Sequence, residues 1–284
     1  MQVLKITELS RVRLRYVNTL SNACLDSKVK YGCGVWNKLS SNQEKEINEL
    51  KVRLLKRVLE LPYSTPSSII KYDFGVTDLD LDCYMEKIIL AYGTLDHDSL
   101  GRKLLNKMME LNVPGFCVEA KKALQVFDLD EESELLLKSG KEIREELKKI
   151  IVGIQRERMV EKMLSESKSD RILLHNFHFD GKAKRYLTEL PFEEARVIFM
   201  LRSRMFPTKD NFKGRWGVEC VHCESVESDI HLFSCVGYCD ILCGVQYDMF
   251  MNLDATIEEL SDGAKKLLKA KERLEMYNST GHSR

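Results

Sequence analysis

The 284-residue sequence lacks the features that mark fibrous, membrane-spanning or secreted proteins. It has only five Pro and fifteen Gly, too few for a fibrous or disordered chain. No apolar run approaches the roughly 18 residues that a membrane-spanning helix needs. The first residues, MQVLKITELSRVRLRY, carry charges where a secretion signal has an apolar centre. We therefore expect an intracellular protein, nuclear or cytoplasmic, with no membrane partner.

The sequence also lacks an excess of charge of one sign, because 44 Lys and Arg balance 44 Asp and Glu. Net charge therefore gives no support for nucleic-acid binding. The charges are nevertheless unevenly placed. Residues 1–60 contain twelve basic and six acidic residues, whereas residues 217–248 contain six acidic residues and no Lys or Arg. We expect any basic surface to be one-sided.

The sequence also lacks the cysteine spacing of a disulfide framework. The nine Cys are odd in number, and five of them are scattered without a framework, which favours reduced thiols. His175 and His178 lie three residues apart with no nearby Cys or paired acid, so we do not expect them to bind a metal.

One stretch does have the spacing of a metal site. Cys220, Cys223, His231 and Cys235 form a C-x2-C-x7-H-x3-C motif. Two Cys on either side of a tight turn supply two donors for zinc, and His231 and Cys235 project the same way from one helical turn. Four protein donors leave no open position, so the motif predicts one structural zinc ion. Cys239 is the alternative fourth ligand, although the i, i+4 step favours Cys235.

The remaining sequence has mainly helical periodicity. Residues 10–30 settle into a helical spacing, and Ser41 followed by Glu44 predicts a capping box at the next helix. That helix should end at Leu61-Pro62, and another should begin near Ser67. A helix is predicted to begin at Ser99, and another to span residues 118–126. A long helix with a kink at Gly153 is predicted within the charge-rich residues 131–168. Two more are predicted, one over residues 192–204 and one that begins at a cap, Asp254 or Thr256.

These patterns predict a mostly α fold, an irregular multi-helix array with a small C-terminal CCHC zinc knuckle. Three domains are expected: helices over residues 1–165, basic helices and the knuckle over residues 166–253, and a final helix with a frayed tail over residues 254–284.

Two patches resemble non-LTR retrotransposon reverse transcriptases. KYGCGVW, a basic helix and RVLELPYSTPSSIIKYDFGV are similar to the region after the polymerase palm, with its YG-x-x-x-W element and Leu-Pro-x-x-Thr-Pro turn. RSRMFPTKDNFKGRW and the Cys/His motif resemble the zinc-binding tail of the same proteins. The resemblance implies thumb-like helices in residues 1–165 and a tail that grips nucleic acid. It also implies a detached C-terminal portion of a longer polymerase.

The catalytic carboxylates of a polymerase are absent from this sequence. Those enzymes need a Tyr-x-Asp-Asp hairpin to hold metal ions, and no such motif occurs here. Asp78, Asp80 and Asp82 alternate with Leu and are interpreted as the polar side of a short extended piece or of a helix start. We therefore expect a protein that is not an enzyme.

Cations and aromatic residues gather just before the Cys/His motif. Basic groups hold phosphates, and an aromatic ring can stack on an unpaired base. Phe206 and Phe212 are interleaved with these cations, and with the Trp they could instead form the small core that a knuckle needs. The predicted nucleic-acid-binding residues are Arg202, Arg204, Lys209, Lys213, Arg215 and Trp216.

The leading hypothesis is a non-catalytic fragment that binds RNA or DNA, structured or partly single-stranded. The alternative from another class is a helical interaction or scaffold protein, or a relic without function, in which zinc only stabilises the fold. A third hypothesis is that the chain completes a polymerase by docking on a separate palm.

Overall fold

The computed structural model describes residues 14–33, 40–93, 99–111, 113–165, 178–212 and 218–280. Its longer helices are α2 (Leu14–Ser21), α4 (Ser41–Val58), α5 (Ser67–Phe74), α6 (Leu79–Ile88), α7 (Leu100–Glu110), α8 (Phe116–Val126), α9 (Gly140–Ser165), α11 (Phe192–Arg202) and α15 (Ile257–Thr280). Its shorter helices are α3 (Ser27–Lys30), α10 (Arg185–Glu189), α12 (Asp229–Leu232), α13 (Cys239–Leu242) and α14 (Tyr247–Asn252). Two π-helical segments, Asn22–Asp26 and Ile89–Gly93, join α2 to α3 and extend α6.

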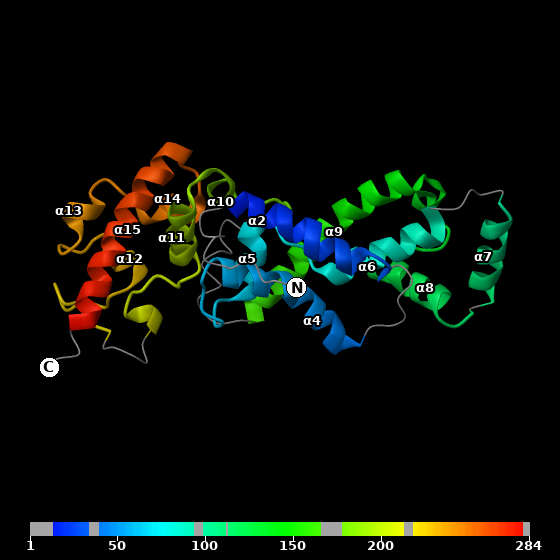
Figure 1. Ribbon diagram of the computed structural model, residues 1–284, viewed down its shortest axis with the longest axis horizontal. Coiled ribbons are helices and arrows are strands. Elements are labelled where there is room, and N and C mark those ends of the chain that lie inside the picture. The colour runs from blue at the N-terminus through cyan, green and yellow to red at the C-terminus, as the bar shows by residue number, and fades with distance from the viewer. Residues whose placement is uncertain are drawn as a thin grey trace.

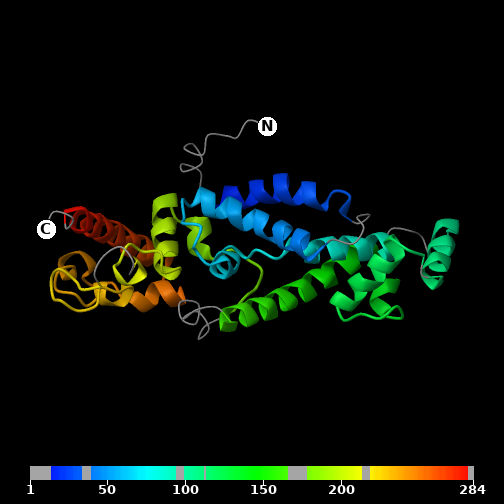
Figure 2. The ribbon, with the colours of Figure 1, turned by 90° about the horizontal axis from the view of Figure 1, so that it is seen from below.

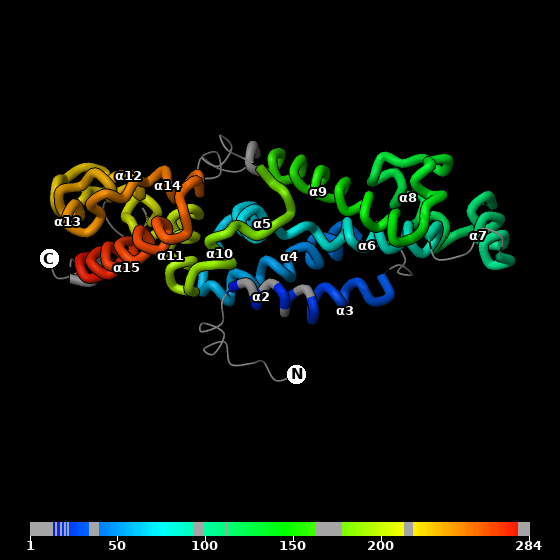
Figure 3. The backbone as a smooth tube through the Cα atoms, turned by 90° about the horizontal axis from the view of Figure 1, so that it is seen from above, coloured from blue at the N-terminus to red at the C-terminus, as the bar shows by residue number. Residues whose placement is uncertain are grey.

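These elements confirm the mostly α prediction. Within the described ranges the chain forms no strand, and its β pairing is limited to an isolated bridge between Glu219 and Val226. The helices form an elongated array, with α7 at one end and α13 and α15 at the other (Figure 1). In the middle of the array, α5 and α6 lie between α4 and α9, and α2 packs on the outer side of α4 (Figures 2 and 3).

Two large hydrophobic cores hold the array together. The larger core runs from Leu14 through Phe199 to Leu274, so residues from all three predicted domains share it. The second core is built from α6, α8 and α9 with their connections, and Leu147 is one of its fully buried side chains. Since α9 contributes Met159 to the larger core as well, this long helix connects the two.

Helix starts follow local side-chain chemistry. The predicted capping box is one residue earlier than expected: Ser40, not Ser41, caps α4, and its partner is Gln43, not Glu44. Both boxes have the required spacing, but only Ser40 has the extended backbone that a cap needs. The predicted starts of α5 and α7 are confirmed, and Thr256 caps α15 by accepting a hydrogen bond from Glu259 N at 3.2 Å.

The three Asp residues at the start of α6 confirm the helix-start interpretation, because α6 begins directly after Asp78. Each carboxylate is buried and faces a cation from another element. The ion pairs are Lys71–Asp78 at 2.5 Å, Arg158–Asp80 at 3.1 Å and Lys30–Asp82 at 2.9 Å. These carboxylates therefore link α6 to α5, α9 and α3.

A further ion pair, the most deeply buried of those described, joins α5 to α11. Arg202 is 3% exposed and Asp73 is 0% exposed. The Arg202 guanidinium donates to both carboxylate oxygens of Asp73 at 2.8 Å, and also to the carbonyl oxygens of Phe250 and Met251. Tyr186 donates its hydroxyl to Asp73 at 2.6 Å. Burial alone would lower the pKa of Arg202, but the adjacent Asp73 carboxylate raises it, so the guanidinium stays charged.

We predict that Arg202→Met destabilises the protein by about 3–5 kcal/mol, because the Asp73 charge would stay buried without its partner. Urea unfolding followed by circular dichroism measures this loss. The double variant Asp73→Asn, Arg202→Met should lose less than the sum of the single variants, since it leaves no buried charge. Arg185→Met, which breaks an exposed pair with Glu189, is the control and should change stability little. Equal effects of Arg202→Met and Arg185→Met would contradict the structural role.

A pH dependence follows from the α6 carboxylates. Burial raises the pKa of Asp80 and of Asp82 above the ordinary value of 3.8, and this outweighs the opposing effects of Arg158 and Lys30. A raised pKa in the folded state means that the folded protein binds protons more tightly. The stability that these two groups contribute is thus fully present below pH 3.8 and is lost as the pH rises through their raised pKa values.

We therefore predict that the double variant Asp80→Asn, Asp82→Asn loses less stability than the parent protein as the pH rises above 3.8. Urea unfolding at a series of pH values gives the slope of the free energy of unfolding against pH for each protein. The comparison uses these slopes and not the absolute stabilities. Parallel curves would show that the burial of these carboxyls does not control their titration.

Candidate metal centre

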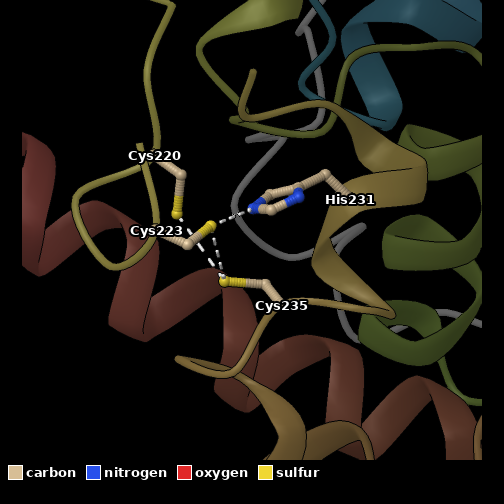
Figure 4. A group of neighbouring side chains, drawn as sticks. All are labelled: Cys220, Cys223, His231 and Cys235. Carbon is tan, nitrogen blue, oxygen red and sulfur yellow. Dashed lines mark hydrogen bonds between the residues drawn. The ribbon is translucent and has the colours of Figure 1, made fainter. Parts of the chain in front are cut away.

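A tight turn places the first two sulfur ligands. Cys220 N donates to Ser225 O at 2.7 Å, and Glu224 N donates back to Cys220 O at 3.0 Å. Glu224 has a positive φ of 60°, which reverses the chain direction within the loop. The bridge from Glu219 to Val226 closes the base of the turn. As a result Cys220 and Cys223 project their side chains to the same side (Figure 4).

A short helix and the turn that follows it place the other two ligands. Ser228 caps α12 by accepting a hydrogen bond from His231 N at 3.2 Å, which fixes the backbone of that residue. The helix ends at Leu232, and the chain then turns so that Cys235 lies opposite the first two Cys (Figure 4).

The four ligand atoms lie within 4.8 Å of one another. Cys220 Sγ is 3.6 Å from Cys235 Sγ, and Cys223 Sγ is 3.3 Å from His231 Nε2. Ligands about 2.3 Å from an ion at tetrahedral corners would be about 3.8 Å apart. The cluster can therefore hold a metal ion, as the spacing of the motif predicted. Cys239 lies outside the cluster, is exposed and donates its thiol to Val236 O at 3.1 Å, so the structure selects Cys235.

The surroundings of the ligands influence their protonation. Burial raises the pKa of Cys235 to about 12 and lowers the pKa of His231. Hydrogen bonding from the backbone of Ser225 lowers the pKa of Cys223. His231 is thus neutral near pH 7, as a ligand must be, whereas the Cys235 thiol has to release its proton when a cation binds.

The centre is attached to the long helix α15. His222 lies within the Cys220–Cys223 turn and makes edge-on ring contacts with Tyr238 and Tyr277, at centroid distances of 5.5 and 5.0 Å. A Cβ atom at Gly237 would collide with the His222 ring, so glycine is required there.

Arg273 of α15 adds polar contacts to the same attachment. It donates to Gly237 O and to Asp240 Oδ1, both at 2.8 Å. The contributions of Arg273 and Tyr277 could not be inferred from the sequence, because no spacing rule connects the knuckle with a helix about 40 residues later.

The predicted nucleic-acid-binding residues lie in different environments in the structure. The prediction is wrong for Arg202, which is buried and bonded to Asp73 and so cannot reach a ligand at the surface. Arg204 is half-buried and has a positive φ of 53°. Lys209 donates its ammonium to Glu219 O at 2.6 Å, at the base of the knuckle. The other three predicted residues, Lys213, Arg215 and Trp216, lie outside the described residues.

The aromatic residues before the knuckle are at least partly structural. Phe206 is fully buried in the larger core, as the core alternative expected, and Phe212 is half-buried. On the knuckle itself, apolar side chains are 52–69% exposed although they adjoin the ligands: Val221, Val226, Ile230 and Val236. This surface is apolar and acidic, since residues 217–248 contain no Lys or Arg.

Comparisons with protein-family models, with curated proteins and with solved structures found no match for this chain. Every helix in the described part of the chain is too short or too polar to span a membrane. The function of the chain must therefore be inferred from its own residues.

We predict that the purified protein holds one metal ion per chain and that Cys220→Ser loses it. The missing thiolate breaks the four-donor set, so the melting temperature should fall together with the metal content. Inductively coupled plasma mass spectrometry and thermal unfolding measure the two effects. Cys239→Ser is the matched control, because it removes a neighbouring thiol outside the cluster. Metal loss in both variants, or in neither, would contradict this ligand set.

Proposed function

We propose that the Cys/His cluster holds one structural zinc ion. Three thiols and one imidazole are the donor set that zinc prefers, and all four tetrahedral positions are filled by the protein. An ion without an open position orders the chain around it, so its role here is structural and not catalytic.

We further propose that the protein is a non-catalytic nucleic-acid-binding fragment, derived from a retroelement reverse transcriptase. The observation that carries this proposal is the attachment of the cation-rich segment to the metal centre. Lys209 N donates to Glu227 Oε1 at 3.2 Å, and Asp210 N donates to Glu227 O at 3.0 Å. Together with the bond from the Lys209 ammonium, these contacts tie the segment to the base of the knuckle.

The mechanism follows from that attachment. When zinc orders the knuckle, it also orders Lys209 and Asp210, which bond to it, before nucleic acid arrives, and this reduces the entropy cost of binding. Phosphates would be held by Arg204, Lys209, Lys213 and Arg215, and Trp216 would stack on a base. Arg202 has no part in this surface. The ligand is RNA or DNA that is structured or partly single-stranded, and a separate polymerase palm is the protein partner that the resemblance implies.

A second candidate function is an interaction or scaffold role. The observation that favours it is the face of α7, where Leu100, Leu104 and Leu111 are 60–83% exposed. These residues lie about one, two and three helical turns apart, at the outer end of the array (Figure 1). Exposed apolar residues in such a row are typical of a protein-binding surface.

We predict that the protein binds structured RNA with a strong dependence on salt concentration. The triple variant Lys209→Ala, Lys213→Ala, Arg215→Ala should reduce the slope of log affinity against log salt by about 0.7–0.9 for each phosphate that the variant no longer neutralises. Fluorescence anisotropy over a salt series measures the slope, with a DNA of the same sequence alongside.

A matched control removes three exposed cations far from the knuckle, in Lys138→Ala, Lys141→Ala, Lys148→Ala. This variant has the same net charge as the first one. If both variants lower the slope equally, the protein has only general electrostatic affinity. If neither variant changes it, the binding surface lies elsewhere.

A further inference from the structure

A cationic cavity lies where the central helices meet the C-terminal part of the protein. Its volume is about 280 Å³. The basic and aromatic part of its wall consists of Tyr72, His178, Lys184, Arg185, Tyr186 and Arg202. The rest of the lining comes from α14, α15 and their connection, and it is apolar apart from Asn252: Met251, Leu253, Ala255, Ile257 and Leu260.

The charge of this lining is one-sided. Three of the lining residues are Lys or Arg, and none is acidic. The acidic residues of the first turns of α15, Glu258, Glu259 and Asp262, line a neighbouring cavity that shares only Ala255 with this one. The two cavities thus have opposite charge preferences.

The three cations contribute differently. The charge of Arg202 at the floor is cancelled by Asp73. Lys184 donates its ammonium to the neutral carbonyl of His178 at 3.1 Å and lies 4.6 Å from the Tyr72 ring centroid. Among the described residues, these contacts of Lys184 are with a carbonyl oxygen and a ring, neither of which carries a formal negative charge.

Arg185 is at the exposed rim. It pairs with Glu189 at 3.0 Å on the same short helix. Exposed pairs of this kind are weak, so the guanidinium can exchange this carboxylate for a ligand anion. A dianion between Lys184 and Arg185 would receive charge-assisted hydrogen bonds from two cations, while an apolar body could contact Leu253 and Ile257.

From this arrangement we propose that the cavity binds a phosphomonoester. The cavity is somewhat smaller than the roughly 300–1,000 Å³ of sites that enclose a drug-sized molecule, so it fits a small ester or the end of a longer one. A free mononucleotide and the 5′-phosphate end of a nucleic-acid strand have this chemistry in common. The proposal does not depend on the zinc ion or on the cations of residues 204–215, so it can fail or hold independently of the proposed function.

Isothermal titration calorimetry with AMP tests the site, with inorganic phosphate and adenosine as partial ligands. AMP and phosphate should bind at micromolar to millimolar concentrations, and adenosine should bind far more weakly. Lys184→Ala and Arg185→Ala should each weaken AMP binding by roughly 10- to 100-fold, the effect expected for a hydrogen bond to a charged group. Lys182→Ala, on the same segment but outside the lining, should leave binding unchanged. Circular dichroism and thermal unfolding establish that each variant is folded.

A short single-stranded RNA with and without a 5′-phosphate distinguishes the two sources. If the phosphorylated strand binds more tightly than AMP, and Lys184→Ala abolishes this binding, the ligand is a strand end. If AMP binds more tightly than the phosphorylated strand, the ligand is a free nucleotide. The proposal is overturned if neither AMP nor phosphate binds, if adenosine binds as well as AMP, or if Lys182→Ala weakens binding as much as Lys184→Ala.

Discussion

The buried pair between Asp73 and Arg202 is the contact on which the arrangement of this molecule depends. It connects α5, near the middle of the array, to α11, and it also reaches two carbonyl oxygens at the end of α14. A buried charge without its partner costs several kcal/mol, so α11 cannot rotate or slide without a large loss of stability. The knuckle follows α11 in the chain and packs on α15, and its position therefore depends on this pair.

The metal centre and this ion pair stabilise different parts of the structure. The Cys/His cluster is formed by local contacts, because hydrogen bonds among residues 219–235 already define its turn and its short helix. Its attachment to the rest of the protein comes from the contacts of His222 and Arg273 with residues on the far side of the interface. An ion at the centre would order the loop, whereas the packing on α15 decides where the ordered loop faces.

This difference explains what the sequence could predict. Helix starts and metal ligands depend on residues within a few positions of one another, so caps such as Ser99 and the choice of Cys235 could be inferred from spacing. Arg202 was misplaced because its partner Asp73 is 129 residues away in the chain. A helix with a basic residue at its end usually exposes it, but α11 is buried on nearly all sides and has no outward face there. Only the tertiary structure contains that information.

The burial of Arg202 also divides the cations of this region into two groups. Of those that follow it, Lys209 is attached to the knuckle through its bond to Glu219 O, and those that precede it, Lys184 and Arg185, line a cavity to which Arg202 also contributes. The apolar and acidic surface of the knuckle is a poor match for phosphate. An anionic ligand would therefore meet positive charge on the segment before the knuckle or in the cavity, and α11 holds both in place.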